Sequence, residues 1–442
     1  MSPWDALREQ VVEADLCCGC GACAGGCPDD ALEMSFNRHG EYVPHRTQDC
    51  RSCGLCLKVC PFINSNPNED ELGHAHFGEI EGVQHRVETG YYLSAHLGHA
   101  PDPDVRWNGS SGGMATWVLC ELLERDEIDH VLTVTPRRDP DKLFEFCVAS
   151  SPDEVRRCSK SSYYPVEASE VLRFVRENEG RYAFVGLPCA CKAIRLVQRG
   201  NQTIGRRLRW VFGLVCGMQQ ACTCFVSEVA RIAGLPGTPV TVCFRDKSRD
   251  RPASNFGITL EDASGNSRTV PFRKGPNRLW GRGIFSLGAC KYCDDIFSEC
   301  ADAAFMDAWL PEYSNDPEGH SIVLSRSPRL DRLLDGVPTL KRVGIEEVVR
   351  SQSLEQKREK LRVRLFLSKG RTHFPRKRVK PRALGPQKLL EAWMMMGLCR
   401  EARRNLANGL RYNTPRFASI PYRMLDTAGT LVRRLKETLT GQ

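Results

Sequence analysis

Long hydrophobic runs are missing from this sequence of 442 residues. A membrane-spanning helix needs about 20 consecutive apolar residues, and the two most apolar stretches, 209–218 and 392–399, are much shorter. The first 16 residues are acidic and lack the apolar core of a secretory signal. We therefore expect a cytoplasmic protein with no membrane span.

The chain also lacks the composition of a disordered protein, because 41% of its residues are hydrophobic and 26% are charged. Its length suffices for two or three domains, each with its own core. Cysteine is plentiful, with 22 residues. The cytosol keeps protein thiols reduced, so disulfides are not expected. Metal ligation is the better explanation for so many cysteines.

Two cysteine runs near the start of the chain share the spacing C-x2-C-x2-C-x3-C-P, the first within 17–28 and the second within 50–61. A 4Fe-4S cluster needs four thiolates, and the fourth cysteine of each such run typically ligates the cluster of the other run. The predicted ligands of one cluster are Cys17, Cys20, Cys23 and Cys60. The predicted ligands of the other are Cys50, Cys53, Cys56 and Cys27.

A pair of zinc sites is the alternative for these runs, but zinc usually takes two cysteine pairs separated by a longer loop. Small residues such as Gly19, Gly21 and Gly54 let the backbone wrap closely around a cluster. The segment resembles a bacterial two-cluster ferredoxin, which transfers single electrons. Cys18 lies outside the pattern and is expected to be a buried or redox-silent thiol.

The rest of the chain alternates between candidate strands and helices. Residues 65–89 are polar and predict a linker, after which the strand–helix units around 181–200 and 207–234 are the clearest. Such alternation implies a largely parallel sheet. Residues 256–272 predict a β-hairpin with its turn at 264–266.

A third group of cysteines follows these strand–helix units. Cys189 and Cys216 each come just past the carboxyl end of a strand, at the edge where open α/β sheets bind ligands. Cys290 and Cys293 form a C-x2-C pair that could complete four ligands. Buried core thiols are the alternative. The competing ligands are Cys191, Cys222, Cys224 and Cys300, and the expected core thiols are Cys120, Cys147, Cys158, Cys243 and Cys399.

Two loops have the chemistry for a phosphate group. The sequence "NGSSGG" (108–113) precedes a helix, where hydroxyls and backbone N–H groups attract anions and glycines allow close approach. A serine cap with no ligand is the alternative. The sequence "CSKSSYYPVE" (158–167) offers Lys160 for a phosphate and Tyr163 or Tyr164 for stacking, although by itself it reads more simply as a turn before a helix.

Taken together, five segments resemble the family of coenzyme F420 hydrogenase/dehydrogenase beta subunits. They occur in the family's order over residues 90 to about 345, behind a ferredoxin module that several members share. The segments are "NGSSGGMATWVLCELL", "KSSYYPVEASEVL", "FVGLPCACKAIR", "LVCGM" and "ACKYCDDIFSECADAAFMDAWLPEY".

The resemblance implies FAD bound beside a further 4Fe-4S cluster. The implied FAD contacts are Ser110, Ser111, Gly112 and Gly113 around the phosphates, and Lys160, Ser161 and Tyr163 around the flavin. The implied ligands of the third cluster are Cys189, Cys216, Cys290 and Cys293. Asp307 is the implied catalytic residue lining the site.

Three departures from the family pattern concern the substrate rather than the flavin. Met306 replaces the usual glycine before Asp307, and Ala190 stands where relatives often carry glutamine. The segment "LVCGM" lacks the His-Gly that often follows this cysteine. Whether coenzyme F420 itself is a substrate is therefore left open by the sequence.

The end of the chain is strongly basic. Residues 351–442 contain 22 Lys and Arg against 6 Asp and Glu, a net charge of +16, which leaves −8 for the remainder. Such a segment could bind nucleic acid or an anionic membrane surface. Because no nucleic-acid-binding motif accompanies it, docking onto the acidic body of the chain or onto an acidic redox partner is favoured.

These features predict an α+β protein. It comprises a bacterial ferredoxin-like domain (1–64), the linker (65–89), an α/β flavin-binding domain in two parts (90–168 and 169–345) and a basic, mainly helical tail (350–442). The predicted function is an iron–sulfur flavoprotein oxidoreductase that exchanges electrons with a ferredoxin-like partner and hydride with coenzyme F420 or another organic substrate. The alternatives are an electron-relay subunit working with partner redox subunits, and a non-catalytic cluster protein whose tail binds nucleic acid.

Overall fold

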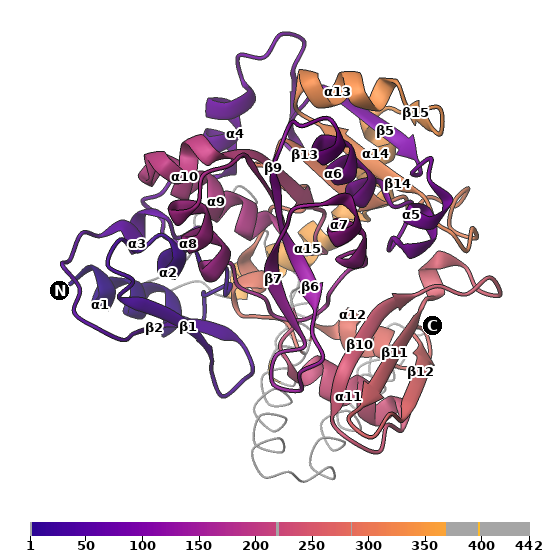
Figure 1. The fold of residues 1–442 in the computed structure, drawn as a ribbon, viewed down its shortest axis with the longest axis horizontal. Helices are drawn as coiled ribbons and strands as arrows, with labels where there is room; N and C mark the ends of the chain where they lie inside the picture. Colours follow the sequence, from indigo (N-terminus) through magenta and orange to yellow (C-terminus); the bar gives the residue numbers. More distant parts are fainter. Residues whose placement is uncertain (1, 218–220, 284, 368–396, 398–442) are drawn as a thin grey trace, which may run out of the picture.

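A computed structural model describes residues 2–217, 221–283, 285–367 and 397 (Figure 1). The amino-terminal module consists of short elements connected by the cysteine loops. They are α1 (Pro3–Leu7), the π-helical turn η1 (Arg8–Val12), α2 (Ala22–Gly25), β1 (Leu32–Phe36), β2 (Tyr42–Arg46) and α3 (Leu55–Lys58).

The two cysteine loops of this module turn sharply at glycine. Gly19, Gly21 and Gly54 have φ values of 69°, 78° and 73°, in the left-handed region that favours glycine. A methyl group on Gly21 would lie 2.7 Å from the backbone nitrogen of Ala168. The amino-terminal module therefore packs backbone against backbone on the following domain, with no room for a side chain at this position.

The segment 65–89, expected to be a linker, contains regular structure. The helix α4 (Glu69–Phe77) begins with a capping box at Asn68 and Glu71, and β3 (Gln84–Arg86) pairs with β4 (Gly90–Tyr92). Lys192 binds Glu69 through a buried ion pair of 3.2 Å. Capping and this ion pair hold the segment against the body of the domain.

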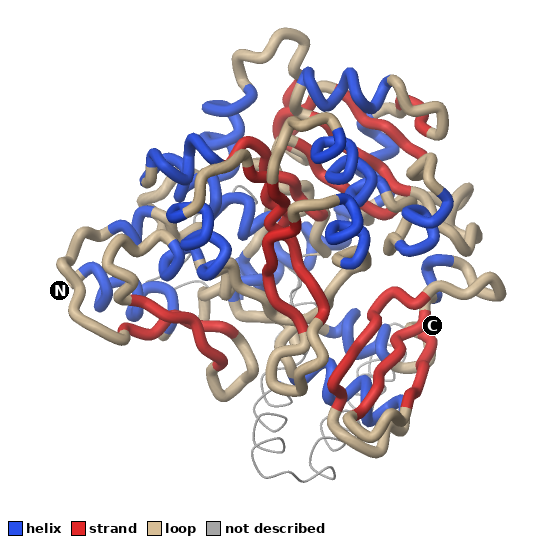
Figure 2. The backbone as a smooth tube through the Cα atoms, in the orientation of Figure 1, coloured by secondary structure: helices blue, strands red, loops and turns tan. Residues whose placement is uncertain are grey.

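One eight-stranded sheet forms the body of the molecule and draws on both predicted parts of the α/β domain (Figure 2). Its strand order is β15-β5-β14-β13-β9-β8-β6-β7. The strands are β5 (Ser94–Gly98), β6 (His130–Pro136), β7 (Phe144–Ala149), β8 (Tyr182–Gly186), β9 (Leu208–Leu214), β13 (Ala303–Asp307), β14 (Ser321–Ser325) and β15 (Leu340–Arg342).

The expectation of a largely parallel sheet holds only for the centre. Strands β13, β9, β8 and β6 run parallel to one another, whereas β7 on one side and β14, β5 and β15 on the other are joined by antiparallel pairings. The type of connection between successive strands explains this mixed pattern. Hairpin returns such as the one from β6 to β7 give antiparallel pairs, and only helical crossovers give parallel ones.

Alternating side chains of the central strands fill two cores, one on each face of the sheet. Tyr182 and Phe184 of β8 pack with α8 (Ser169–Glu177) and α9 (Pro188–Gly200), while Ala183 and Val185 pack with residues of α6 (Met114–Glu124) and α13 (Pro328–Asp335). The smaller helices α5 (Pro103–Asn108), α7 (Pro152–Arg157) and α10 (Gln202–Arg207) lie around them. Helices on both faces explain why the central strands are almost wholly apolar.

A small subdomain follows β9 and lies beside the main sheet (Figure 1). It contains a three-stranded antiparallel sheet, β10 (Pro239–Asp246), β11 (Gly257–Asp262) and β12 (Ser267–Pro271), with α11 (Cys224–Ala233) and α12 (Pro276–Arg282). The predicted hairpin is confirmed, with β11 and β12 antiparallel. Helix α11 ends at Gly234, which has a φ of 68°, as its sequence indicated.

The basic tail is described only at its beginning. Helices α14 (Ile345–Ser351) and α15 (Leu354–Leu367) are present, and the rest of the predicted helical tail lies outside the described residues apart from Gly397. Leu361 of α15 is fully buried, and Arg358 donates a hydrogen bond of 3.0 Å to the Val87 carbonyl. The start of the tail thus docks on the body of the chain. Within the described part of the chain, no helix combines the length and apolar character needed to cross a membrane.

Candidate functional site

The first three cysteines of the amino-terminal run lie with a cysteine of the second run. Burial raises the pKa of Cys60 to about 12, and the charge of the nearby Cys20 adds to this effect. Burial likewise raises the pKa of Cys23, with further contributions from Cys20, Cys17 and Cys60. Burial disfavours isolated thiolates, so a positively charged iron cluster is the kind of group that would keep these side chains ionised.

The second run shows the reciprocal arrangement. Burial raises the pKa of Cys56 to about 11, and the charges of Cys50, Cys53 and Cys27 add to it. Cys27 therefore lies among the cysteines of the other run, as the exchange of the fourth ligand requires. The proximity of these charges agrees with an exchange of the fourth ligand, and the ligand assignment itself stays a prediction.

Cys18 connects this module to the third group of cysteines. Hydrogen bonds to Cys189 and Cys20, followed by burial, raise its pKa. Cys18 is 5% exposed and shares one apolar cluster with the partly buried Cys17, Cys20 and Cys189. The thiol expected to be buried is indeed buried, and it lies between two groups of predicted ligands.

The four predicted ligands of the third cluster come from three segments that converge. Cys189 lies in the first turn of α9, and Cys216 follows β9, the parallel neighbour of β8. The Cys216 N–H donates to the Ile296 carbonyl at 3.0 Å, next to the 3-10 turn (Ala289–Tyr292) that contains Cys290. Residues of all three segments pack in the apolar cluster that contains Cys18.

The competing cysteine ligands lie in other places. The Cys191 thiol is fully buried and donates to the carbonyls of Gly186 and Phe212, both at 3.5 Å. Cys300 is fully buried beneath the sheet in the same core. Cys222 and Cys224 belong to the core of the small subdomain. These four thiols therefore pack in cores, and the assignment of the third ligand set stays a prediction.

A cavity of about 160 Å³ opens at the carboxyl ends of the central parallel strands. Thr133, Val185, Leu214 and Phe305 line it, each from a different one of these strands. The predicted site residues that line it are Ser110, Ser111, Gly113, Lys160, Ser161 and Asp307. This is the edge of an α/β sheet where ligands bind, and it brings together residues that are nearly 200 positions apart in the chain.

The loop 108–113 is shaped by close backbone contacts. The Ser161 N–H donates to the Ser110 hydroxyl at 2.6 Å, and the Ser111 hydroxyl donates to the His320 carbonyl. Gly112 lies behind the cavity wall, where a methyl group would meet the Ser321 nitrogen at 2.7 Å. Gly113 begins α6 with a φ of 78° and provides no side-chain cap. The uncapped first turn of α6 faces the cavity, an arrangement suited to an anion.

Tyr163 does not line this cavity. It is linked to residues of the cavity wall by hydrogen bonds of Arg245, which was not identified from the sequence. Arg245 of β10 donates to the Tyr163 hydroxyl at 3.2 Å, to the Ser110 carbonyl at 2.6 Å and to Asp307 at 2.6 Å. Burial alone would lower the pKa of Arg245, but Asp307 and then Tyr163 outweigh it and raise the pKa. The guanidinium also lies over the Phe256 ring, at 4.4 Å from its centroid.

Further cations surround the same loop. Lys247 donates to the carbonyls of Arg106, Ser111 and Glu318 at 2.6–2.7 Å. Burial, then the charges of Arg245 and Arg106, lowers the pKa of Lys247 to about 7. The only sequence signal for these residues was the basic run "FRDKSR" (244–249), which reads as an ordinary solvated strand end.

Cationic side chains lie on the cavity wall (Lys160) and behind it (Arg245 and Arg106). The Nε atoms of Arg245 and Arg106 are buried and have no hydrogen-bond partner within the described residues. Lys160 lies on the cavity wall with a φ of 79°, and its ammonium contacts Cys243 Sγ at 3.4 Å. Lys160 beside the uncapped start of α6 is the arrangement of the cavity wall that suits a pyrophosphate.

The cavity and the third cysteine group are adjacent. Val215 lines the cavity and packs on the apolar cluster that contains Cys18, and Met306 belongs to both as well. Cys216 is the next residue after Val215. A cluster held there and a ligand in the cavity would be separated by about one layer of side chains.

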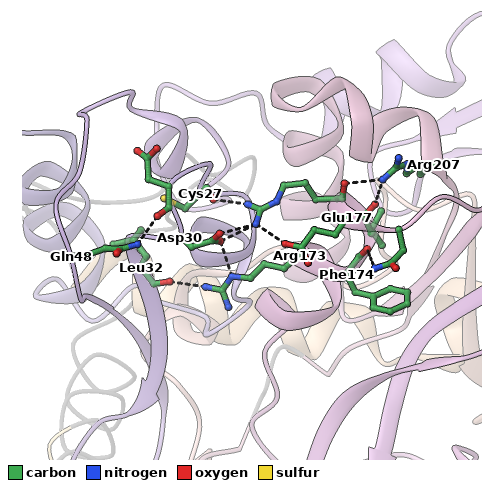
Figure 3. Close-up of polar contacts among 12 residues, drawn as sticks. Cys27, Asp30, Leu32, Gln48, Arg173, Phe174, Glu177 and Arg207 are labelled. Atoms are coloured by element: carbon green, nitrogen blue, oxygen red, sulfur yellow. Dashed lines mark hydrogen bonds and ion pairs between the residues drawn. The ribbon is translucent and has the colours of Figure 1, made fainter.

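Two arginines of α8 hold the amino-terminal module against this domain (Figure 3). Arg173 and Arg176 both bind the Asp30 carboxylate, at 2.9 Å and 2.8 Å. Arg173 also donates to the Leu32 carbonyl, and Arg176 donates to the Cys27 carbonyl at 2.8 Å. The backbone of a predicted cluster ligand is thus bound directly to the α/β domain.

Asp30→Ala should loosen this contact. Burial raises the Asp30 pKa, but the two arginines outweigh it, so the folded pKa lies below the ordinary 3.8. The ion pair therefore stabilises the fold above about pH 4 and is lost as the pH falls through the folded value. Because the Asp30 side chain is 44% exposed, we expect a loss of only about 1 kcal/mol.

Urea unfolding of the cluster-loaded protein at pH 7 measures this loss. Asp29→Ala is the matched control, since Asp29 pairs with Arg51 inside the module. Equal destabilisation by both variants at pH 7 would contradict a specific role for Asp30.

The fold and the two cysteine runs are those of a ferredoxin-like module joined to an α/β domain. Three family models match the chain in agreement with this. The 4Fe-4S dicluster domain matches residues 16–64, and the N-terminal and C-terminal models of the coenzyme F420 hydrogenase/dehydrogenase beta subunit match 95–173 and 179–350. The chain belongs to this family of beta subunits, as the sequence motifs predicted.

Similar proteins in this family are oxidoreductases. Over 369 residues, 80% of this chain, the sequence is 22% identical to the coenzyme F420-dependent sulfite reductase of Methanocaldococcus jannaschii. Over 219 residues, 47% of this chain, it is 24% identical to one of the subunits of the F(420)H(2) dehydrogenase of Methanosarcina mazei. The matches span only 51% and 55% of these relatives.

The fold is similar to that of a chain in a solved structure. It belongs to the F420-reducing [NiFe] hydrogenase complex from Methanosarcina barkeri, with a TM-score of 0.50 and 16% identity. The match covers 66% of this chain and 98% of that chain. The likeness supports the fold of the α/β body.

Proposed function

We propose that this protein is an iron–sulfur flavoprotein oxidoreductase. Single electrons would enter the amino-terminal module from a ferredoxin-like donor and pass through the two clusters to a third cluster at Cys189, Cys216, Cys290 and Cys293. FAD in the cavity would accept these electrons one at a time and exchange two as hydride with coenzyme F420 or another organic substrate. The observation that carries the proposal is that Val215 and Met306 line the cavity and also pack on the cluster-side core.

The residues of the chain supply binding and orientation in this scheme. The first turn of α6, Ser110, Ser111 and Lys160 would hold the pyrophosphate, and Arg245 would hold the Ser110 carbonyl in place behind the cavity wall. A volume of 160 Å³ is smaller than the roughly 300–1,000 Å³ of typical small-molecule sites, so it would enclose one part of FAD. Asp307 would stand at the reacting end, held in place by Arg245.

Metal and flavin content test this proposal directly. After anaerobic purification we expect about twelve iron atoms and twelve acid-labile sulfides per chain, as three 4Fe-4S clusters require, together with one extractable FAD. Reduced ferredoxin should then bleach the flavin absorbance, and oxidised coenzyme F420 should restore it. About eight iron atoms and no flavin would leave only the ferredoxin module supported.

An electron-relay subunit without its own organic substrate is the second candidate. The fold likeness to a chain of a hydrogenase complex favours it. In that case the purified protein would contain the same clusters and flavin but would reduce coenzyme F420 only together with partner redox subunits.

A further inference from the structure

Two cysteines outside all three predicted ligand sets face each other beside the cavity. Cys147 lies on β7 opposite Thr133 of β6, and Cys158 follows the last residue of α7. Their Sγ atoms are 3.6 Å apart, and both residues are only partly buried. The sequence predicted both to be core thiols, and the structure corrects this, because edge strand β7 and the end of α7 leave them accessible.

The pKa values of the two thiols are shifted in opposite directions. The hydrogen bond from Cys147 chiefly lowers the pKa of Cys158 to about 7, with further help from the Thr135 hydroxyl and the charge of Arg157. The same hydrogen bond, followed by burial, raises the pKa of Cys147. The thiolate is the reactive form of cysteine, so Cys158 is the nucleophile of the pair. Cys120 is a contrasting thiol close by, because burial raises its pKa to about 11.

Cys158 also forms part of the cavity wall, as do the next three residues, Ser159, Lys160 and Ser161. The Ser161 N–H holds the Ser110 hydroxyl of the loop 108–113. A disulfide needs the sulfur atoms at about 2.05 Å, so closing the gap from 3.6 Å pulls the start of this wall segment toward β7. The state of the thiol pair is thereby coupled to the shape of the cavity.

We propose that Cys147 and Cys158 form a reversible thiol–disulfide site on the cavity wall, with Cys158 as the attacking thiolate and Cys147 as the resolving thiol. The oxidant is a low-molecular-weight disulfide. Cys158 attacks one of its sulfur atoms, the sulfur–sulfur bond of the small molecule breaks, and one thiolate leaves and takes up a proton. Cys147 then gives its proton to solvent and attacks the Cys158 sulfur, which releases the second small thiol. Two protein thiols are oxidised, and one small disulfide is reduced to two thiols.

Such chemistry is consistent with a reducing compartment, where the disulfides that do form are usually transient, catalytic or redox-sensing. The proposal depends on neither FAD nor coenzyme F420, because it rests on the distance between the two sulfur atoms and on the environment of each thiol. Because the disulfide changes the cavity wall, the thiol pair would adjust ligand binding in the cavity to the redox state of small thiols.

Anaerobic treatment of the cluster-loaded protein with oxidised glutathione, followed by non-reducing peptide mass spectrometry, tests the site. We expect one linked peptide pair, Cys147 with Cys158, lighter by two hydrogen atoms and restored by dithiothreitol, with the iron content unchanged. In Cys147→Ser the glutathione adduct should persist on Cys158. In Cys158→Ser the adduct on Cys147 should form more slowly than the adduct on Cys158 in Cys147→Ser, because burial still raises the pKa of Cys147 after its hydrogen bond with Cys158 is lost.

Two results would overturn the proposal. One is the absence of the linked pair when the iron content is intact. The other is an equal adduct rate on the single remaining cysteine of each variant, which would remove the assignment of roles. If either variant fails to fold, iodoacetamide labelling of the wild-type protein decides instead. Cys158 should be alkylated at least about tenfold faster than Cys120 at pH 7, and equal rates would refute an activated thiolate.

Discussion

Cys60→Ala should release the iron cluster of the first cysteine run, not that of its own run. Cys60 lies with Cys17, Cys20 and Cys23, and their charges act on one another. Without one of its four thiolates, the 4Fe-4S cluster has an iron atom that lacks a protein ligand. We therefore expect the cluster to be lost, which removes about four of twelve iron atoms. Iron analysis after anaerobic purification measures the loss.

Alkylation identifies which cluster has gone. After Cys60→Ala, iodoacetamide should label Cys17, Cys20 and Cys23, while the predicted ligands of the other cluster stay protected, namely Cys27, Cys50, Cys53 and Cys56. Cys18→Ala is the control, since Cys18 contacts Cys20 and Cys189 without belonging to either ligand set, and it should keep its full iron content. Labelling of Cys50, Cys53 and Cys56 in the Cys60 variant would show that the runs do not exchange their fourth ligand.

Arg245→Met should have the largest effect on the α/β domain. Its side chain is 3% exposed and bridges Asp307, Tyr163 and the Ser110 carbonyl. Removing one partner of a buried ion pair costs about 3–5 kcal/mol, because the remaining charge and acceptors lose their donors. We expect the lower end of that range, since Asp307 is 24% exposed, together with a loss of FAD from the purified protein.

Urea unfolding and the ratio of flavin to protein measure the two effects. Arg249→Ala is the matched control, because Arg249 follows the same strand but is exposed. Its guanidinium lies over the Trp107 ring. The double variant Arg245→Met with Asp307→Asn should recover part of the lost stability, since it removes the unpaired charge. Full flavin content in Arg245→Met would contradict a role for this arginine in cofactor binding.

Local features of the site were readable from the sequence. The cysteine spacing, the stop at Gly234 and the hairpin at 256–272 all depend on residues a few positions apart, where backbone geometry is fixed by the local sequence. The placement of Cys189 and Cys216 at one sheet edge followed from the order of two adjacent strand–helix units.

Arg245 was not readable in the same way. It belongs to a small subdomain whose strand β10 carries it to a loop 135 residues earlier in the chain. Nothing in the neighbouring sequence separates Arg245 from Lys247 or Arg249, although Lys247 is partly buried and bound to backbone carbonyls whereas Arg249 is exposed. Pairing over such distances depends on how whole elements pack.

The sequence by itself determined that this chain carries ferredoxin-type cysteine runs and an α/β body typical of these beta subunits, because these are matters of spacing and periodicity within short windows. The tertiary structure alone decided that the sheet is antiparallel on both flanks, that Arg245 reaches Asp307, and that Cys147 lies 3.6 Å from Cys158. The reason is that side chains from distant segments meet only after strand order and subdomain packing are set, and local spacing does not specify either of them.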